Sequence, residues 1–281
     1  MVPVDTAVRV ADEMKRPKDL ADHGLGGEAG AGAETVRSLV HDHGFVGGNA
    51  IIAPLLGVEG AEEHRAEAIR RLQSVAELDM FVKTLDEKGN YELKVKVSNK
   101  RAGHHLPTSL TFMRQIWLEV TVTNSLGEIV FTSGLLGADN SLPDGTVIFR
   151  NNTVDKDGKD TIDPWKIAGV TETNTIPPKG HRYGLYHFNL SPHATGFNVT
   201  ARLHYRSYDQ TVADVLLGKG AITVPSVTMK TLSRSFNMSG QLVADQQGTV
   251  SPVRRYPAPT LTGTALMGCF GGASTTKQFV G

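Results

Sequence analysis

The sequence predicts a mainly β protein, an antiparallel β-sandwich that follows a helical and loop-rich segment and precedes an extended arm. Three observations predict this fold class. Apolar and polar side chains alternate with a period of two, turn residues separate the alternating runs, and a helical repeat is confined to one stretch before them. The 281 residues are 40% hydrophobic and 21% charged, which provides enough apolar surface for a core.

The alternation is clearest in the run Tyr91, Leu93, Val95 and Val97, whose neighbours are all polar. Such a strand buries one face and exposes the other. Further strands are expected at residues 80–85, 116–123, 128–132, 146–150, 182–190 and 197–205. Short strands that are separated by Gly, Pro and Asn turns, without helices between them, favour an immunoglobulin-like sandwich over a parallel sheet.

The same alternation predicts which side chains point into the sandwich. Six of them are expected to face inward: Leu93, Val95, Leu118, Val120, Val199 and Leu203. Trp117 and Trp165 are expected to anchor the core or an interface, because aromatic rings bury large areas.

The pattern divides the chain into three regions. Residues 1–78 form a loop-rich wrapping segment that ends in an amphipathic helix at 61–78, where apolar residues recur at intervals of three and four residues. Residues 79–233 form the sandwich, with a short helix at 210–217. Residues 234–281 are polar and contain several Pro and Gly residues, so an extended arm or tail is expected there.

The two ends of the chain are expected to mediate assembly. Residues 1–60 and 235–281 are rich in Gly, Ala and polar side chains. They bury too little apolar surface by themselves to offset an ordering cost of ~1–2 kcal/mol per residue. We therefore expect them to contact another copy of the chain or a partner protein.

Composition excludes several function classes. Lys plus Arg and Asp plus Glu number 29 each, so no overall field favours nucleic acid. No apolar run approaches the ~20 residues of a membrane-spanning helix. Cys269 is the single cysteine, which excludes an intrachain disulfide and a CxxCH site for covalent heme. The first residues lack the features of a signal peptide, which fits a cytoplasmic, processed or fragmentary chain.

Two segments carry a resemblance. Residues 97–109 (VSNKRAGHHLPTS) and 114–124 (RQIWLEVTVTN) resemble the GHxxPT…RQxWLEVxVT block in the C-terminal region of multiheme c-type cytochromes. Residues 41–49 (HDHGFVGGN) resemble the stretch that follows the last heme motifs of that family. The resemblance covers residues 40–205. Where the family places its final CxxCH, this chain reads ADEMKRP at 11–17, without heme-attachment residues.

The resemblance implies a heme-free, non-catalytic structural or binding subunit associated with an extracytoplasmic multiheme cytochrome electron-transfer system. Its location is then periplasmic or extracellular, and its partner is a c-type cytochrome or another copy of the chain, not nucleic acid. His43 and His104 match family histidines and are candidate axial ligands, in trans, to a heme carried by the partner. In the structural alternative, His43 packs in a Gly-rich loop and Gly103 and Pro107 shape the turn around His104.

A second function stays open from the residues themselves. His41 and His43 form an HxH pair, which on an extended segment points both rings to one side and suits copper or zinc. Together with His104 they suggest a redox enzyme subunit that holds copper or noncovalent heme. No catalytic residue is assigned, because the chain has no GxSxG, HExxH or P-loop motif.

Overall fold

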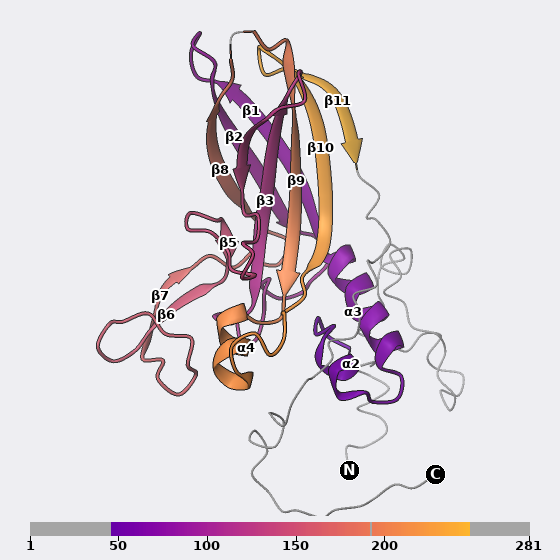
Figure 1. Ribbon diagram of the computed structural model, residues 1–281, viewed down its shortest axis with the longest axis vertical. Helices are drawn as coiled ribbons and strands as arrows, with labels where there is room; N and C mark the ends of the chain where they lie inside the picture. The colour runs from indigo at the N-terminus through magenta and orange to yellow at the C-terminus, as the bar shows by residue number, and fades with distance from the viewer. Residues whose placement is uncertain (1–45, 192, 248–281) are drawn as a thin grey trace, which may run out of the picture. The chain divides into compact units, whose positions relative to one another are not determined.

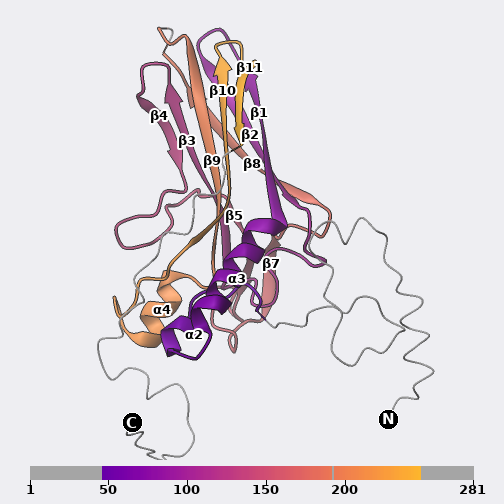
Figure 2. The ribbon, with the colours of Figure 1, turned by 90° about the vertical axis from the view of Figure 1, so that its right-hand side faces the viewer.

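The computed structural model describes residues 46–191 and 193–247. Two antiparallel sheets face each other, and the helices lie together at one end of them (Figures 1 and 2). The helices are α2 Ile52–Leu56, α3 Ala61–Val75 and α4 Gln210–Leu217. The strands are β1 Ala76–Thr84, β2 Asn90–Asn99, β3 Gln115–Asn124, β4 Ile129–Ser133, β5 Ile148–Phe149, β6 Asn151–Val154, β7 Gly169–Thr173, β8 His181–Asn189, β9 Gly196–Arg206, β10 Val227–Asn237 and β11 Leu242–Gln247.

The strand order is that of an immunoglobulin-like sandwich. The three-stranded sheet has the order β1-β2-β8, and the large sheet has the order β11-β10-β9-β3-β4, with β5 paired to β3. The chain moves from the first sheet to the second after β2 and returns for β8, as the fold requires. β6 and β7 form a separate two-stranded ribbon. The predicted mainly β, antiparallel sandwich is confirmed.

The core lies between the two sheets. All six side chains that the alternation places inside are 0% exposed: Leu93, Val95, Leu118, Val120, Val199 and Leu203. Aromatic rings fill one region of it, where Tyr91 lies 5.4 Å from Phe188 and 5.1 Å from Phe197 between ring centroids. Trp117 is also buried, whereas Trp165 is 75% exposed on the loop between β6 and β7 and takes no part in the core.

The helix before the sandwich is shorter than the sequence indicates. α3 buries Ala68, Ile69 and Leu72 on one face, as its periodicity predicts. It ends at Val75 because Ala76 adopts extended backbone and pairs with Asn99, which begins β1. The sandwich therefore starts three residues before the expected boundary at 78/79, since the β alternation already applies to Ala76.

The start of the expected arm is part of the large sheet. Residues 234–247 complete β10 and form β11, with Phe236 buried in the core. Asn237 closes the turn between these strands, because its side-chain oxygen accepts hydrogen bonds from the backbone N–H groups of Ser239 and Gln241. The polar composition of this stretch belongs to strand faces that point to solvent. Residues 248–281 lie outside the described residues.

Gly134 and Gly127 offer a matched test of the packing at the end of β4. Both have positive φ angles, but a Cβ at Gly134 overlaps the carbonyl oxygen of Leu118, whereas a Cβ at Gly127 meets nothing within 4 Å. We expect Gly127→Ala to cost about 1 kcal/mol of unfolding free energy for its backbone conformation alone. Gly134→Ala should cost about 3 kcal/mol or more. Urea unfolding measures both, and equal losses would contradict the packing described.

Candidate functional site

Of the three histidines singled out from the sequence, the structure places one. His104 lies on the loop between β2 and β3, at one end of the three-stranded sheet, and its side chain is exposed. His41 and His43 lie outside the described residues. Within residues 46–191 and 193–247, no group of three or more His, Cys, Asp or Glu side chains is arranged to hold a metal ion.

The ring of His104 is held by one nitrogen and free at the other. Its Nδ1 lies 2.9 Å from the carbonyl oxygen of His105. A carbonyl oxygen can only accept a hydrogen bond, so this contact requires a proton on Nδ1. In the neutral ring, Nε2 then carries the lone pair, and none of the described residues forms a hydrogen bond with it. The loop thus presents an imidazole acceptor to solvent.

A buried amide fixes the loop that carries His104. Asn99 is 0% exposed, and its Nδ2 donates to the carbonyl oxygen of His104 at 2.8 Å. Its Oδ1 accepts from the backbone N–H of Ala102 at 3.1 Å. An unmatched amide at this depth costs about 1–3 kcal/mol, so the side chain favours the one loop conformation that satisfies it.

The far side of the loop is attached to the segment before β8. The backbones of Leu106 and Ile176 exchange two hydrogen bonds, of 2.9 and 2.8 Å. The ring of His105 contacts the Thr175 hydroxyl at 2.9 Å. The Leu106–Pro107 peptide bond is cis. His104 is therefore fixed on both sides, by Asn99 and by this bridge.

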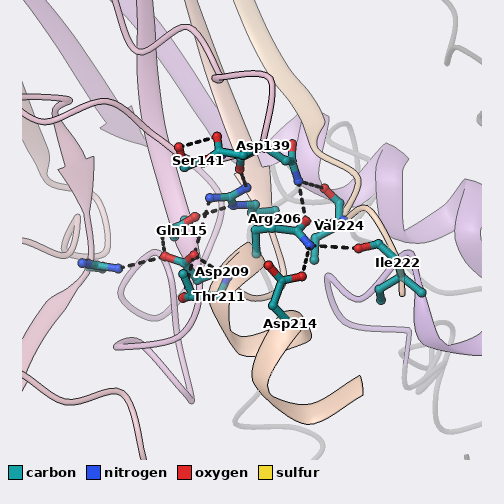
Figure 3. Close-up of polar contacts among 12 residues, drawn as sticks. Gln115, Asp139, Ser141, Arg206, Asp209, Thr211, Asp214, Ile222 and Val224 are labelled. Atoms are coloured by element: carbon teal, nitrogen blue, oxygen red, sulfur yellow. Dashed lines mark hydrogen bonds and ion pairs between the residues drawn. The ribbon is translucent and has the colours of Figure 1, made fainter. Parts of the chain in front are cut away.

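A second polar cluster, which was not anticipated, lies where β3 begins and β9 ends, at the same end of the sandwich as the His104 loop. Arg206 is 1% exposed and donates from Nε to Gln115 and from Nη1 to the backbone oxygen of Asn140 at 2.7 Å (Figure 3). Asp209 lies 3.9 Å from Arg206 and 3.7 Å from Arg150, so one carboxylate serves two guanidinium groups. Burial lowers the pKa of Arg206, and Asp209 opposes that shift.

Trp117 joins this cluster to its neighbours on the same face of the sheet. Its Nε1 donates to the carbonyl oxygen of Gly134 at 3.1 Å, and its ring stacks on His204 at 5.1 Å and lies 5.5 Å from the Arg206 guanidinium. His204 also contacts Glu119 at 3.0 Å. Burial alone would raise the pKa of Glu119, but His204 and Arg202 outweigh it and hold the pKa below its ordinary value.

The contacts of the Arg206 cluster hold parts of the fold together. Its members join the sheet to the loop at 134–147 and to α4, where Gln210 bonds the backbone of Ile222 and Val224. Most of its polar groups hold the chain in place, although Nη2 of Arg206 is buried without a hydrogen-bond partner among the described residues. The sequence offered no sign of it, since Gln115, Trp117 and Arg206 share the outward parity of β3 and β9, which predicts exposure, and yet are buried.

A small pocket lies beside the start of α3. The hydroxyl of Tyr205 is buried in it without a hydrogen-bond partner among the described residues. Gly48 lies against that ring, since a Cβ there would come within 3.4 Å of the hydroxyl. Ser207 and Ser226 also line this pocket, so it offers an ordered water further polar partners besides the Tyr205 hydroxyl.

Comparisons with known proteins give distant structural neighbours. No family model and no curated protein matches the chain. It is similar to a penta-heme cytochrome c552 from Thermochromatium tepidum, with a TM-score of 0.47 and 17% identity, over 60% of this chain and 41% of that one. It is also similar to the Northeast Structural Genomics Consortium target SoR45, with a TM-score of 0.23 and 11% identity, over 56% of this chain and 82% of that one.

The cytochrome is much longer than the part that this chain matches. The similarity spans less than half of its length, and it concerns a protein whose name states five hemes.

No helix in the described ranges is long and apolar enough to span a bilayer.

Asn99→Ala tests whether the buried amide fixes the His104 loop. Its removal leaves the His104 carbonyl and the Ala102 N–H without their partner, so we expect a loss of about 1–3 kcal/mol. Hydrogen exchange of the amides at 100–106 should become faster while exchange in β3 and β9 stays unchanged. Asn198→Ala, at an exposed amide that bonds Ser235, is the control. Unchanged exchange in the loop of the Asn99 variant would refute the anchoring role.

Arg206→Ala tests the second cluster. The substitution leaves the buried oxygen of Gln115 and the backbone oxygen of Asn140 without their donor, while Asp209 keeps Arg150, so we expect about 2–4 kcal/mol of destabilisation. Arg202→Ala, on the same strand, removes a guanidinium that is 41% exposed and should cost about 1 kcal/mol or less. Chemical unfolding, followed by the fluorescence of Trp117, measures both. Similar losses for the two variants would contradict the structural role of Arg206.

Proposed function

We propose that the protein is a non-catalytic binding subunit of an extracytoplasmic multiheme cytochrome system, and that His104 supplies an axial ligand to a heme carried by the partner chain. The observation that supports this most is the state of the His104 ring. Its Nδ1 is committed to a backbone carbonyl, and its Nε2 is exposed on an anchored loop.

This arrangement is the one that iron ligation needs. A ligating imidazole usually donates its other N–H to a carbonyl or carboxylate, which fixes the tautomer and the ring orientation. Here the His105 carbonyl provides that acceptor, and Asn99 holds the backbone on which both residues lie. The bound heme would supply electron transfer, while this chain would contribute the ligand, its orientation and the docking surface.

The partner must bring the heme. With the single thiol of Cys269, this chain cannot form the two thioether links of a CxxCH site. The resemblance of residues 97–124 to the block that follows the hemes in multiheme cytochromes makes a c-type cytochrome the partner we propose, in the periplasm or outside the cell. Of the segments 1–60 and 235–281 that were expected to make contacts, residues 46–60 and 235–247 belong to the described fold, and the others remain proposed contacts for that partner or for another copy of the chain.

A ferric heme peptide with one histidine ligand and one open axial position tests the ligand. Addition of the native protein should convert its high-spin spectrum to a low-spin one. His104→Ala should abolish or strongly weaken this conversion, because the exposed Nε2 is lost. His187→Ala, at another exposed histidine, which lies 3.7 Å from Glu92, should leave it unchanged. Visible absorption and electron paramagnetic resonance provide the measurements.

A second pair of substitutions separates the two functions that the sequence left open. The variant with both His41→Ala and His43→Ala should still produce the low-spin spectrum if His104 is the ligand. Loss of the spectrum in this variant, with retention in His104→Ala, would contradict the proposal. That result, or copper retained by the purified protein and lost in the double variant, would instead favour a site built on His41 and His43.

A further inference from the structure

The outward face of the three-stranded sheet combines exposed apolar side chains with lysines. The strand register sets them in neighbouring cross-strand rows. One row contains Phe81, Lys94 and Leu185, and the next contains Asp79, Lys96 and Tyr183. Lys83 lies on the same face, opposite Glu92. We call the following six residues the basic face: Phe81, Lys83, Lys94, Lys96, Tyr183 and Leu185.

The apolar members of the basic face are open to solvent. Phe81 is 51% exposed, Leu185 is 54% exposed and Tyr183 is 43% exposed. The helices lie at the end of the sandwich and leave this face uncovered (Figures 1 and 2). Tyr183 and Leu185 are neighbours on the outward face of β8, and Lys94 alone separates Leu185 from Phe81 in the cross-strand row. Single exposed apolar residues are ordinary, but three gathered on one sheet face are typical of an interaction surface.

The charges on this face do not cancel. Two of the three acids among the lysines have cationic partners, since Asp79 pairs with Arg234 and Glu77 lies 3.7 Å from Lys100. Glu92 lies 3.7 Å from His187, which is a cation only when it is protonated. Within the described part of the chain, Lys83, Lys94 and Lys96 form no ion pair with a carboxylate. Lys94 instead lies over the Tyr183 ring at 5.4 Å from its centroid. The three lysines therefore outnumber Glu92, the one carboxylate of this face without a cationic partner.

We propose that the basic face docks a protein partner whose contact surface presents carboxylates around an apolar centre. Such a surface would bury Phe81 and Leu185 and pair with the lysines around them, which gives both affinity and orientation. The inference does not rest on the heme-ligand role of His104. It adds a second contact, on the sheet that leads to the His104 loop through Asn99 and Gly180.

Charge and shape disfavour other occupants. A second copy that used the same face would offer the three lysines only Glu92 as a carboxylate without a cationic partner. Single-stranded nucleic acid needs several free aromatic faces for stacking, but Tyr183 is already in contact with Lys94 and His181, which leaves Phe81 alone on this face. Binding to an anionic bilayer typically uses four to eight clustered cations, and the basic face has three.

A synthetic amphipathic helical peptide, with a Leu and Phe stripe flanked by Glu, is the probe. Titration into the isotope-labelled full chain should shift the backbone resonances of β1, β2 and β8, and added salt should weaken the binding. Lys94→Glu combined with Lys96→Glu should lower the affinity by about tenfold or more. Lys94→Gln with Lys96→Gln is a milder pair that keeps the test valid if charge reversal impairs folding.

The control makes the same charge change elsewhere. Lys156→Glu with Lys159→Glu, on the exposed loop after β6, should leave the affinity unchanged. Equal losses in the two charge-reversal variants would show general charge attraction and overturn the proposal. It would also be overturned by resonance shifts confined to other strands, by equal binding of the peptide with Lys in place of Glu, or by tighter binding of oligothymidine or anionic vesicles.

Discussion

The antiparallel pairing of β3 with β9 is the interaction on which the rest of the structure depends. It joins Gln115–Asn124 to Phe197–Arg206 in one unbroken register. Inward, the pairing places Leu118 beside Leu203 in the core; outward, it places Trp117 beside His204, with Arg206 next along the strand. A slip of one residue would exchange these two sets and bury the charges of Arg202 and Glu119 between the sheets. Sandwich core and buried polar cluster thus follow from one register.

Much of this fold could be predicted from the sequence, because apolar and polar side chains alternate clearly along the strands that have one solvent-exposed face. The alternating runs around Val95, Leu118 and Val199 predicted both the sandwich and the side chains that form its core. β10 was missed because a bulge between Thr228 and Lys230 interrupts its period of two, and because Lys230 and Arg234 stand in register with the inward-facing Leu203 and Val199. The same parity that places Tyr91 and Val97 inward also places Asn99 inward. A buried amide at the end of β2 could therefore have been predicted.

The candidate site was predictable only in part. The resemblance singled out His104, but no pattern in the sequence reports which ring nitrogen carries the proton, since that depends on the His105 carbonyl and on the loop that Asn99 fixes. The Arg206 cluster was not predictable, because Asn140 and Asp209 reach it from loops whose course is set by tertiary packing. Local periodicity carries information about strands, and such contacts arise only once the strands have packed.

The most direct test of this account is the protonation of the His104 ring itself. Nitrogen-15 chemical shifts of its two ring nitrogens, recorded in the full chain where the imidazole is neutral, distinguish the two tautomers without any partner. The account predicts the Nδ1–H tautomer, with Nε2 as an unprotonated acceptor, because the His105 carbonyl can only accept. A ring that carries its proton on Nε2 would have no lone pair to offer iron there and would contradict the account.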